Sequence, residues 1–206
     1  MTASLSGPGL WYATRSAGLV ALLLLTASTV LGVLTAGRFS TPQWPRFLTV
    51  GLHRNIALLA SGFLILHIVT IVLDRFTSIP LTAAFVPFAS TYKSFWLALG
   101  AVALDLLIVL IVTSLVRGRL GYQGWRLVHW CGYACWPLAV AHGVGAGTDS
   151  RTLWAASLNL GCIAVVAGAV AWRLLQPWPE RRVLRLSMAA AAAVSVPVAL
   201  GLGGFG

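Results

Sequence analysis

Two apolar stretches decide how this chain folds: LHRNIALLASGFLILH at residues 52–67 and WRLVHWCGYACWPLAVAH at residues 125–142. Each stretch carries two of the chain's four histidines, which are His53, His67, His129 and His142. The two members of a pair stand 14 and 13 residues apart, which is roughly 20 Å along a helix axis. Each stretch, as a helix, therefore offers one imidazole near each side of a bilayer.

The composition is that of a membrane protein. Only 9% of the 206 residues are charged and 59% are hydrophobic, whereas a soluble domain carries roughly 25% charged residues. Too little polar sequence remains for a separate soluble domain. The net charge of +10 does not indicate nucleic acid as a partner, because the arginines separate apolar segments and form no basic face. Membrane lipid is the expected surrounding.

We expect one all-α domain over residues 1–206, a polytopic membrane helix bundle of about six transmembrane helices. Each candidate span holds about 20 apolar residues, enough to cross a bilayer. The candidates are 15–37, 47–73, 94–116, 125–146, 152–175 and 183–203. The last is alanine-rich and contains Pro197.

Basic residues predict the orientation of this bundle. The first, third and fifth connections hold ten arginines, and the opposite side holds Arg15, Arg75, Lys93 and Arg151. The positive-inside rule makes the ten-arginine connections cytoplasmic in a multi-pass protein of the cell membrane. The second and fourth spans then run in the same direction. His53 and His129 share the inner level, and His67 and His142 share the outer level.

Two imidazoles at each level suit two stacked b-type haems, held between the second and fourth spans. Two axial imidazoles saturate haem iron and favour electron transfer over binding of a substrate to the metal. A zinc site would need three or four ligands at one depth. The alternative is that the histidines only form hydrogen bonds between helices, although intramembrane histidines are rare and usually face the bundle interior.

The angular positions require a distorted helix in the fourth span. A spacing of 14 residues returns to within about 40° of the same face, but a spacing of 13 misses by about 140° on an ideal helix. Pro137 lies between His129 and His142, with Gly132 close by. A proline kink changes local winding. We therefore predict an overwound, distorted helix around Pro137.

The two quoted stretches resemble the ferric reductase-like transmembrane domain family, which includes the membrane parts of NADPH oxidases, ferric-chelate reductases and the haem subunit of the methionine-sulfoxide reductase system. The resemblance covers a core over residues 15–175, and 183–203 is an additional C-terminal span. It implies that His53 and His129 ligate the inner haem iron, and that His67 and His142 ligate the outer one. An arginine often follows the first histidine in this family, and here it is Arg54.

This resemblance implies an oxidoreductase electron-transfer component. Many relatives continue into a flavin and nicotinamide domain, and this sequence shows none. We therefore expect an external donor, either a separate flavoprotein reductase or membrane quinol. The outer electron acceptor is expected to be ferric iron, oxygen or an extracytoplasmic redox protein.

Several polar residues are candidates for supporting roles. Haem propionates are anionic and need cationic partners. The candidates are Arg54, Arg46 and Arg126 at the inner level and Arg75, Lys93 and Arg151 at the outer level. Membrane topology explains most of these residues equally well. Asp105, in the middle of the third span, relays protons, contacts a quinone, or stays protonated and hydrogen-bonded. Asp149 is expected to cap the fifth span. The loop 74–93 is expected at the outer interface, where it could cap the outer site.

Three hypotheses remain open. The first is a di-haem b-type cytochrome with a cytoplasmic-side flavoprotein donor. The second is a quinol-linked electron-transfer subunit, which Asp105 motivates. The third is a haem-free transporter or assembly subunit whose histidines serve protons or structure.

Overall fold

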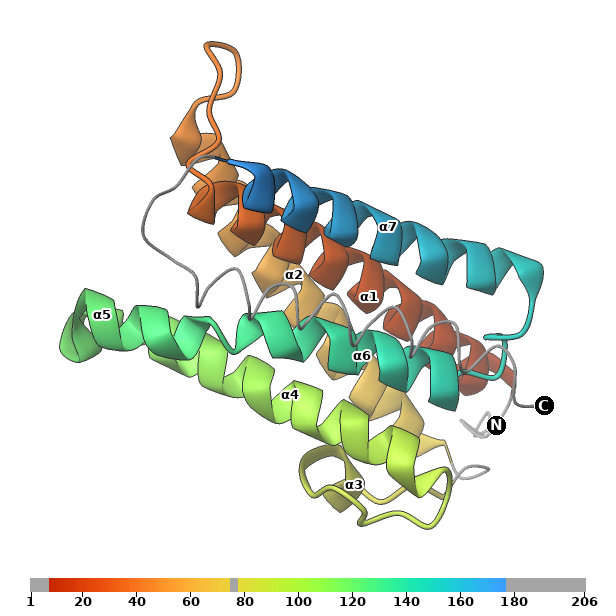
Figure 1. The fold of residues 1–206 in the computed structure, drawn as a ribbon. Helices are drawn as coiled ribbons and strands as arrows, with labels where there is room; N and C mark the ends of the chain where they lie inside the picture. The colour runs from red at the N-terminus through yellow and green to blue at the C-terminus, as the bar shows by residue number, and fades with distance from the viewer. Residues whose placement is uncertain (1–7, 75–77, 177–206) are drawn as a thin grey trace.

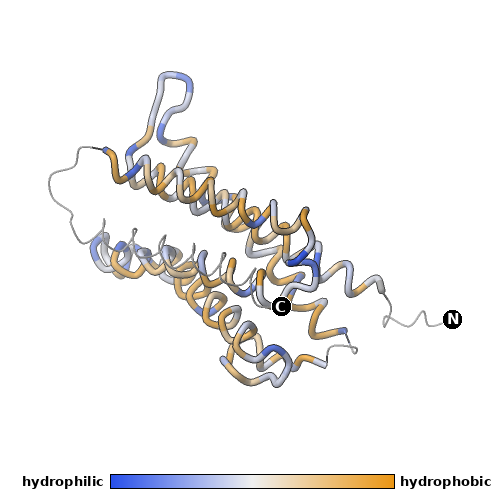
Figure 2. The backbone as a smooth tube through the Cα atoms, turned by 45° about the vertical axis from the view of Figure 1, so that its right-hand side comes forward, coloured by the Kyte–Doolittle hydropathy of each residue, from blue (hydrophilic) through white to orange (hydrophobic). Residues whose placement is uncertain are grey.

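The computed structural model of this chain describes residues 8–74 and 78–176, and every regular element in this part is an α-helix (Figure 1). The seven helices of this part are α1 (Pro8–Ala36), α2 (Arg46–Leu73), α3 (Thr82–Phe85), α4 (Ser94–Leu115), α5 (Arg117–His129), α6 (Gly132–Ala146) and α7 (Leu153–Leu175). Figure 2 shows hydrophobic residues along the long helices and hydrophilic residues gathered at the turns. The prediction of an all-α membrane protein is confirmed.

Four helices are long and apolar enough to cross a membrane: α1, α2, α4 and α7. The last three begin and end within one residue of the expected spans, whereas α1 begins at Pro8, well before the expected Arg15. The sixth expected span, 183–203, and Arg75 lie outside the described residues.

The fourth expected span, 125–146, is divided between two helices. Helix α5 ends at His129 and α6 begins at Gly132, with a turn at Trp130 and Cys131 between them. With 15 residues, α6 is about 22 Å long and does not cross a hydrocarbon core of about 30 Å alone. The two helices follow one another along α4 in Figure 1, so together they take the place of the fourth span.

A second break lies inside α5 at Gly121, whose φ of 68° and ψ of 162° are not helical. A positive φ favours glycine, because a side chain in this region is strained. Residues before the break belong to a basic segment with Arg117 and Arg119, both exposed. The segment after it leads directly to His129.

The apolar core joins α1, α6 and α7. Its buried members are Leu22, Val33, Trp136, Val140, Cys162, Ile163, Val166 and Val170. Trp136 also donates a hydrogen bond from Nε1 to Thr26 Oγ1 at 3.0 Å, which satisfies a buried indole N–H and ties α6 to α1. A smaller cluster of Leu107, Leu110 and Cys135 joins α4 to α6.

Helix α2 is placed differently from the other spans. It packs along α1, and within the described ranges it makes no comparably extensive contact with α4, α5 or α6. Its apolar window is also the least buried of the four candidate spans. The two histidines of α2 therefore approach α5 and α6, although the rest of α2 makes little contact with these helices.

Candidate functional site

The four histidines form two pairs at two levels of the bundle. The ring centres of His53 and His129 are 6.1 Å apart, and those of His67 and His142 are 6.5 Å apart. The ring planes within each pair are almost perpendicular, at 81° and 82°. These are the two pairs expected from the depth argument.

The separation of the rings suits one metal ion between the members of each pair. Two imidazoles on opposite sides of a metal, each with a metal–nitrogen bond of about 2.0 Å, have ring centres roughly 6 Å apart. The observed 6.1 and 6.5 Å agree with this arrangement. Nowhere in residues 8–74 and 78–176 do three or more His, Cys, Asp or Glu side chains gather to hold a metal ion. The described part of the chain therefore offers two histidine side chains at each level.

Three of the histidines are held by backbone carbonyls. The Nδ1 atoms of His53 and His67 donate to the carbonyl oxygens of Ser28 and Thr14 on α1, both at 2.8 Å. His142 Nδ1 donates to the carbonyl oxygen of Trp96 on α4 at 2.9 Å. A carbonyl only accepts, so Nδ1 carries the hydrogen and Nε2 keeps the lone pair that binds a metal.

His129 is oriented in another way. Its Nδ1 is buried without a hydrogen-bond partner in the described part of the chain. Its ring stacks on Trp125, with ring centres 4.8 Å apart and planes inclined by 28°. Trp125 is held in turn by a hydrogen bond of 3.2 Å from Nε1 to Ser114 Oγ on α4.

The winding between His129 and His142 supplies part of the extra rotation that a 13-residue spacing needs to reach one face. Several N–H groups donate to the carbonyl three residues earlier: Trp130 to Leu127, Cys131 to Val128, Tyr133 to Trp130 and Ala134 to Cys131. Such bonds wind the chain at about 3.0 residues per turn in place of 3.6, so each residue turns further round. The predicted overwinding is confirmed.

Its predicted centre at Pro137 is wrong, because Pro137 lies within α6 and the interruption comes at Trp130 and Cys131. Proline has no N–H for the carbonyl four residues earlier, which is that of Tyr133. The missing hydrogen bond disturbs the helix on the N-terminal side of Pro137. The hydrogen bonds over three residues also lie on this side, and the last of them is donated by Ala134.

The cations expected near haem propionates differ in their surroundings. Arg46 and Arg54 are exposed in the N-terminal part of α2. Arg126 lies over the rings of Tyr122 and Trp130, at 5.7 and 5.5 Å from their centres. A role for Arg54 beside a haem stays a prediction.

At the end of the bundle nearer His67 and His142, Lys93 Nζ donates to the carbonyl oxygens of Gly145 and Ala146, at 3.1 and 3.2 Å. It thereby caps the last turn of α6, where a cation is favoured by the helix dipole. Asp105 is half-buried in the middle of α4, and its role also stays a prediction.

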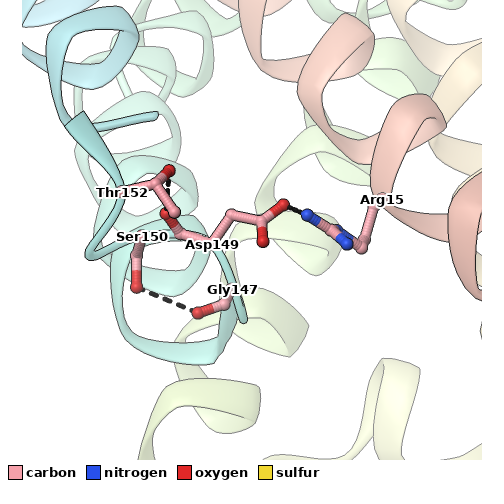
Figure 3. A network of polar contacts seen from close by, with 5 residues as sticks. All are labelled: Arg15, Gly147, Asp149, Ser150 and Thr152. Atoms are coloured by element: carbon pink, nitrogen blue, oxygen red, sulfur yellow. Dashed lines mark hydrogen bonds and ion pairs between the residues drawn. The ribbon is translucent and has the colours of Figure 1, made fainter. Parts of the chain in front are cut away.

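Figure 3 shows the outer polar network, in which Arg15 of α1 forms an ion pair with Asp149. The expectation that Asp149 caps α7 is wrong. The N-cap residue is Thr152, whose N–H and Oγ1 donate to the Asp149 carbonyl at 2.8 and 2.7 Å. The carboxylate pairs with Arg15 because a charge that is largely removed from solvent loses hydration, and an opposite charge beside it offsets this loss.

The residues that support the histidines were not predicted from the sequence. Gly18 and Gly32 lie beside the rings of His67 and His53, and Gly100 lies beside that of His142. One signal was present: Gly18 and Gly32 are 14 residues apart, the same spacing as His53 and His67. When two neighbouring helices run antiparallel, equal spacings allow both contacts to form at once, Gly18 with His67 and Gly32 with His53.

Fold and site together define a class: an all-α membrane protein with two stacked pairs of facing imidazoles. The family model described as ferric reductase like transmembrane component matches residues 17–140, which is more than half of the chain. The chain belongs to this family. The match includes His53, His67 and His129 and ends shortly before His142. No curated protein and no solved structure matched the chain.

Membership supports the coarse function as well. Ferric reductase-like transmembrane domains generally bind haem and act as components of transmembrane electron transfer.

Proposed function

We propose that this chain is a di-haem b-type membrane cytochrome that moves electrons from a cytoplasmic-side donor to an outer acceptor. The observation that carries the proposal is the geometry of the two histidine pairs, with ring centres 6.1 and 6.5 Å apart. Within three of the four rings, the hydrogen bond at Nδ1 leaves Nε2 as the ligand atom. Membership in the ferric reductase-like family supports the choice of haem.

Each haem would supply a one-electron carrier whose iron is saturated by protein ligands. The chain's own residues hold and separate the two carriers. His53 and His129 serve the inner level and His67 and His142 the outer level, roughly 20 Å away along the helices. Arg54 is proposed to hold an inner propionate.

The direction of transfer follows from the basic residues. By the positive-inside rule, the arginines at the ends of α1, α2, α4 and α7 nearer His53 and His129 support a cytoplasmic position for this level. We infer that a separate flavoprotein reductase delivers electrons there. The outer acceptor is ferric iron, oxygen or an extracytoplasmic redox protein, which makes the chain the electron-transfer component of an oxidoreductase.

Single histidine variants test the proposal. We expect His67→Ala and His142→Ala each to lose the outer haem and keep the inner one. The residues that flank each histidine in the sequence have no side-chain nitrogen that could bind iron in its place. His53→Ala should lose the inner haem. A pyridine haemochrome assay, together with a reduced-minus-oxidised spectrum, counts the haems per chain.

Two exposed neighbours provide matched controls. Leu66→Ala on α2 and Leu127→Ala on α5 stand beside the histidines but are 47% and 66% exposed. Both controls should keep two haems. Wild-type protein without a Soret band, or histidine variants that keep both haems, would contradict the proposal.

The donor is tested separately with the purified wild-type protein. We expect NADPH with a flavoprotein reductase to reduce both haems faster than an excess of quinol does. Faster reduction by quinol would instead favour a quinol-linked subunit, for which Asp105 in the middle of α4 would be the first residue to replace.

A further inference from the structure

Three glycines share one position relative to the histidine anchors. Thr14, Ser28 and Trp96 supply the carbonyls that accept from histidine Nδ1. Four residues after each of them stands a glycine, namely Gly18, Gly32 and Gly100. The same relation occurs on two helices and at both levels.

Helix geometry explains why this position matters. A helical carbonyl already accepts from the N–H four residues later, and its second lone pair remains available. The Cβ of that later residue points back along the helix and lies over the same face. A side chain there covers the carbonyl, whereas glycine leaves it open to a ring from the neighbouring helix.

The distances show that the space is taken by the rings. A Cβ on Gly100 would lie 2.6 Å from His142 Nδ1, and one on Gly18 would lie 2.9 Å from His67 Nδ1. A Cβ on Gly32 would lie 3.3 Å from His53 Cε1. The first two separations are shorter than Cβ atoms tolerate, so a side chain at Gly100 or Gly18 would force the ring or the helix to move. The third separation is tight but needs only a small shift.

His129 provides a contrast. On α4, Val109 stands as far from Trp96 as His129 stands from His142. The residue four positions after Val109 is Thr113, and its hydroxyl donates to the Val109 carbonyl at 2.6 Å. The α4 position that lacks the glycine therefore corresponds to His129, the histidine whose Nδ1 has no partner among the residues that the structure describes.

We propose that Gly18, Gly32 and Gly100 are positioning residues that let His67, His53 and His142 donate from Nδ1 to a helix carbonyl, so that Nε2 is presented to haem iron. This inference rests on the proposed di-haem function. A hydrogen bond from Nδ1–H makes the ligating nitrogen more basic and favours oxidised iron. The glycines therefore set both the retention and the reduction potential of the haem on their own level.

Alanine variants of the three glycines test this inference in the full-length purified protein. We expect Gly100→Ala and Gly18→Ala to lose the outer haem and keep the inner one, with the larger loss in Gly100→Ala. We expect Gly32→Ala, whose added Cβ is the least crowded of the three, to keep both haems and to raise the midpoint potential of the inner haem alone. Haem content and redox titration are the measurements.

Matched controls are Gly62→Ala on α2 and Gly161→Ala on α7, where an added Cβ meets nothing within 4 Å. Both should keep two haems with unchanged potentials. The inference is overturned if the three test variants behave like these controls, or if they lose both haems together. Wild-type protein without haem would overturn the proposed function itself, and with it the inference.

Discussion

Each histidine ring takes its plane from a different support. His53 and His67 are anchored on α1, His142 on α4, and His129 by stacking on Trp125. Because the supports come from different directions, the rings of each pair cross at 81° and 82°. Ligand planes that cross in this way leave two iron d orbitals almost equal in energy.

The crossed planes predict the electron paramagnetic resonance spectrum of the oxidised protein. We expect two highly anisotropic low-spin signals, because near-degenerate orbitals spread the g values widely. Low-temperature spectra of the purified protein give the measurement, and His142→Ala should remove one of the two signals. An ordinary rhombic low-spin signal from both haems would contradict the ring orientations.

At the scale of the elements, the tight winding between α5 and α6 controls which way His142 faces. The hydrogen bonds over three residues around Trp130 and Cys131 add rotation that brings His142 closer to the side that carries His129. The interruption also divides the fourth span into an inner part that carries His129 and an outer part that carries His142.

An insertion tests this dependence on winding. One alanine inserted between Cys131 and Gly132 turns the following helix by about 100° and moves it by about 1.5 Å. We expect loss of the outer haem and retention of the inner haem, measured as haem per chain. The same alanine inserted after Gly147, beyond His142, is the control and should keep both haems. Two haems in both insertion variants would show that the break absorbs the change.

At the scale of the whole molecule, polar links at the outer end hold the helices together. The ion pair of Arg15 and Asp149 joins α1 to the turn between α6 and α7 (Figure 3). Both side chains are 23% exposed, so solvent still screens them in part. The guanidinium also lies 3.9 Å from the ring centre of Trp11.

A double-mutant cycle with Arg15→Gln and Asp149→Asn measures this link. We expect a coupling of about 1 kcal/mol, the upper part of the range for accessible ion pairs. Thermal unfolding in detergent, at matched haem content, provides the free energies. Additive effects of the two substitutions would mean that the pair contributes nothing to stability.

The orientation in the membrane is a second property of the whole molecule. Exposed arginines at one end of the bundle include Arg38, Arg46, Arg54, Arg117 and Arg119. We expect a reporter inserted at Thr41 to behave as cytoplasmic and one inserted at Ser78 to behave as extracytoplasmic. Paired fluorescent-protein and alkaline-phosphatase fusions measure both positions, and the reverse pattern would place the inner histidine level outside.

Hydropathy and spacing were enough to predict much of this protein. The spans that became α2, α4 and α7 end where their apolar runs end, because the bilayer requires about 20 apolar residues whatever their neighbours are. The pairing of His53 with His129 and of His67 with His142 followed from depth alone. Depth is a property of position along a span, which the order of residues contains.

Only the tertiary structure shows what lies beside each histidine. The carbonyls of Thr14, Ser28 and Trp96, and the glycines that expose them, belong to other helices. The pairing of Asp149 with Arg15 likewise replaced a local cap with a distant partner. Lateral packing and rotation of helices depend on contacts between residues far apart in the chain. Hydrophobic periodicity reports depth and length but not these neighbours, so it could predict the histidine pairs and not the residues that support them.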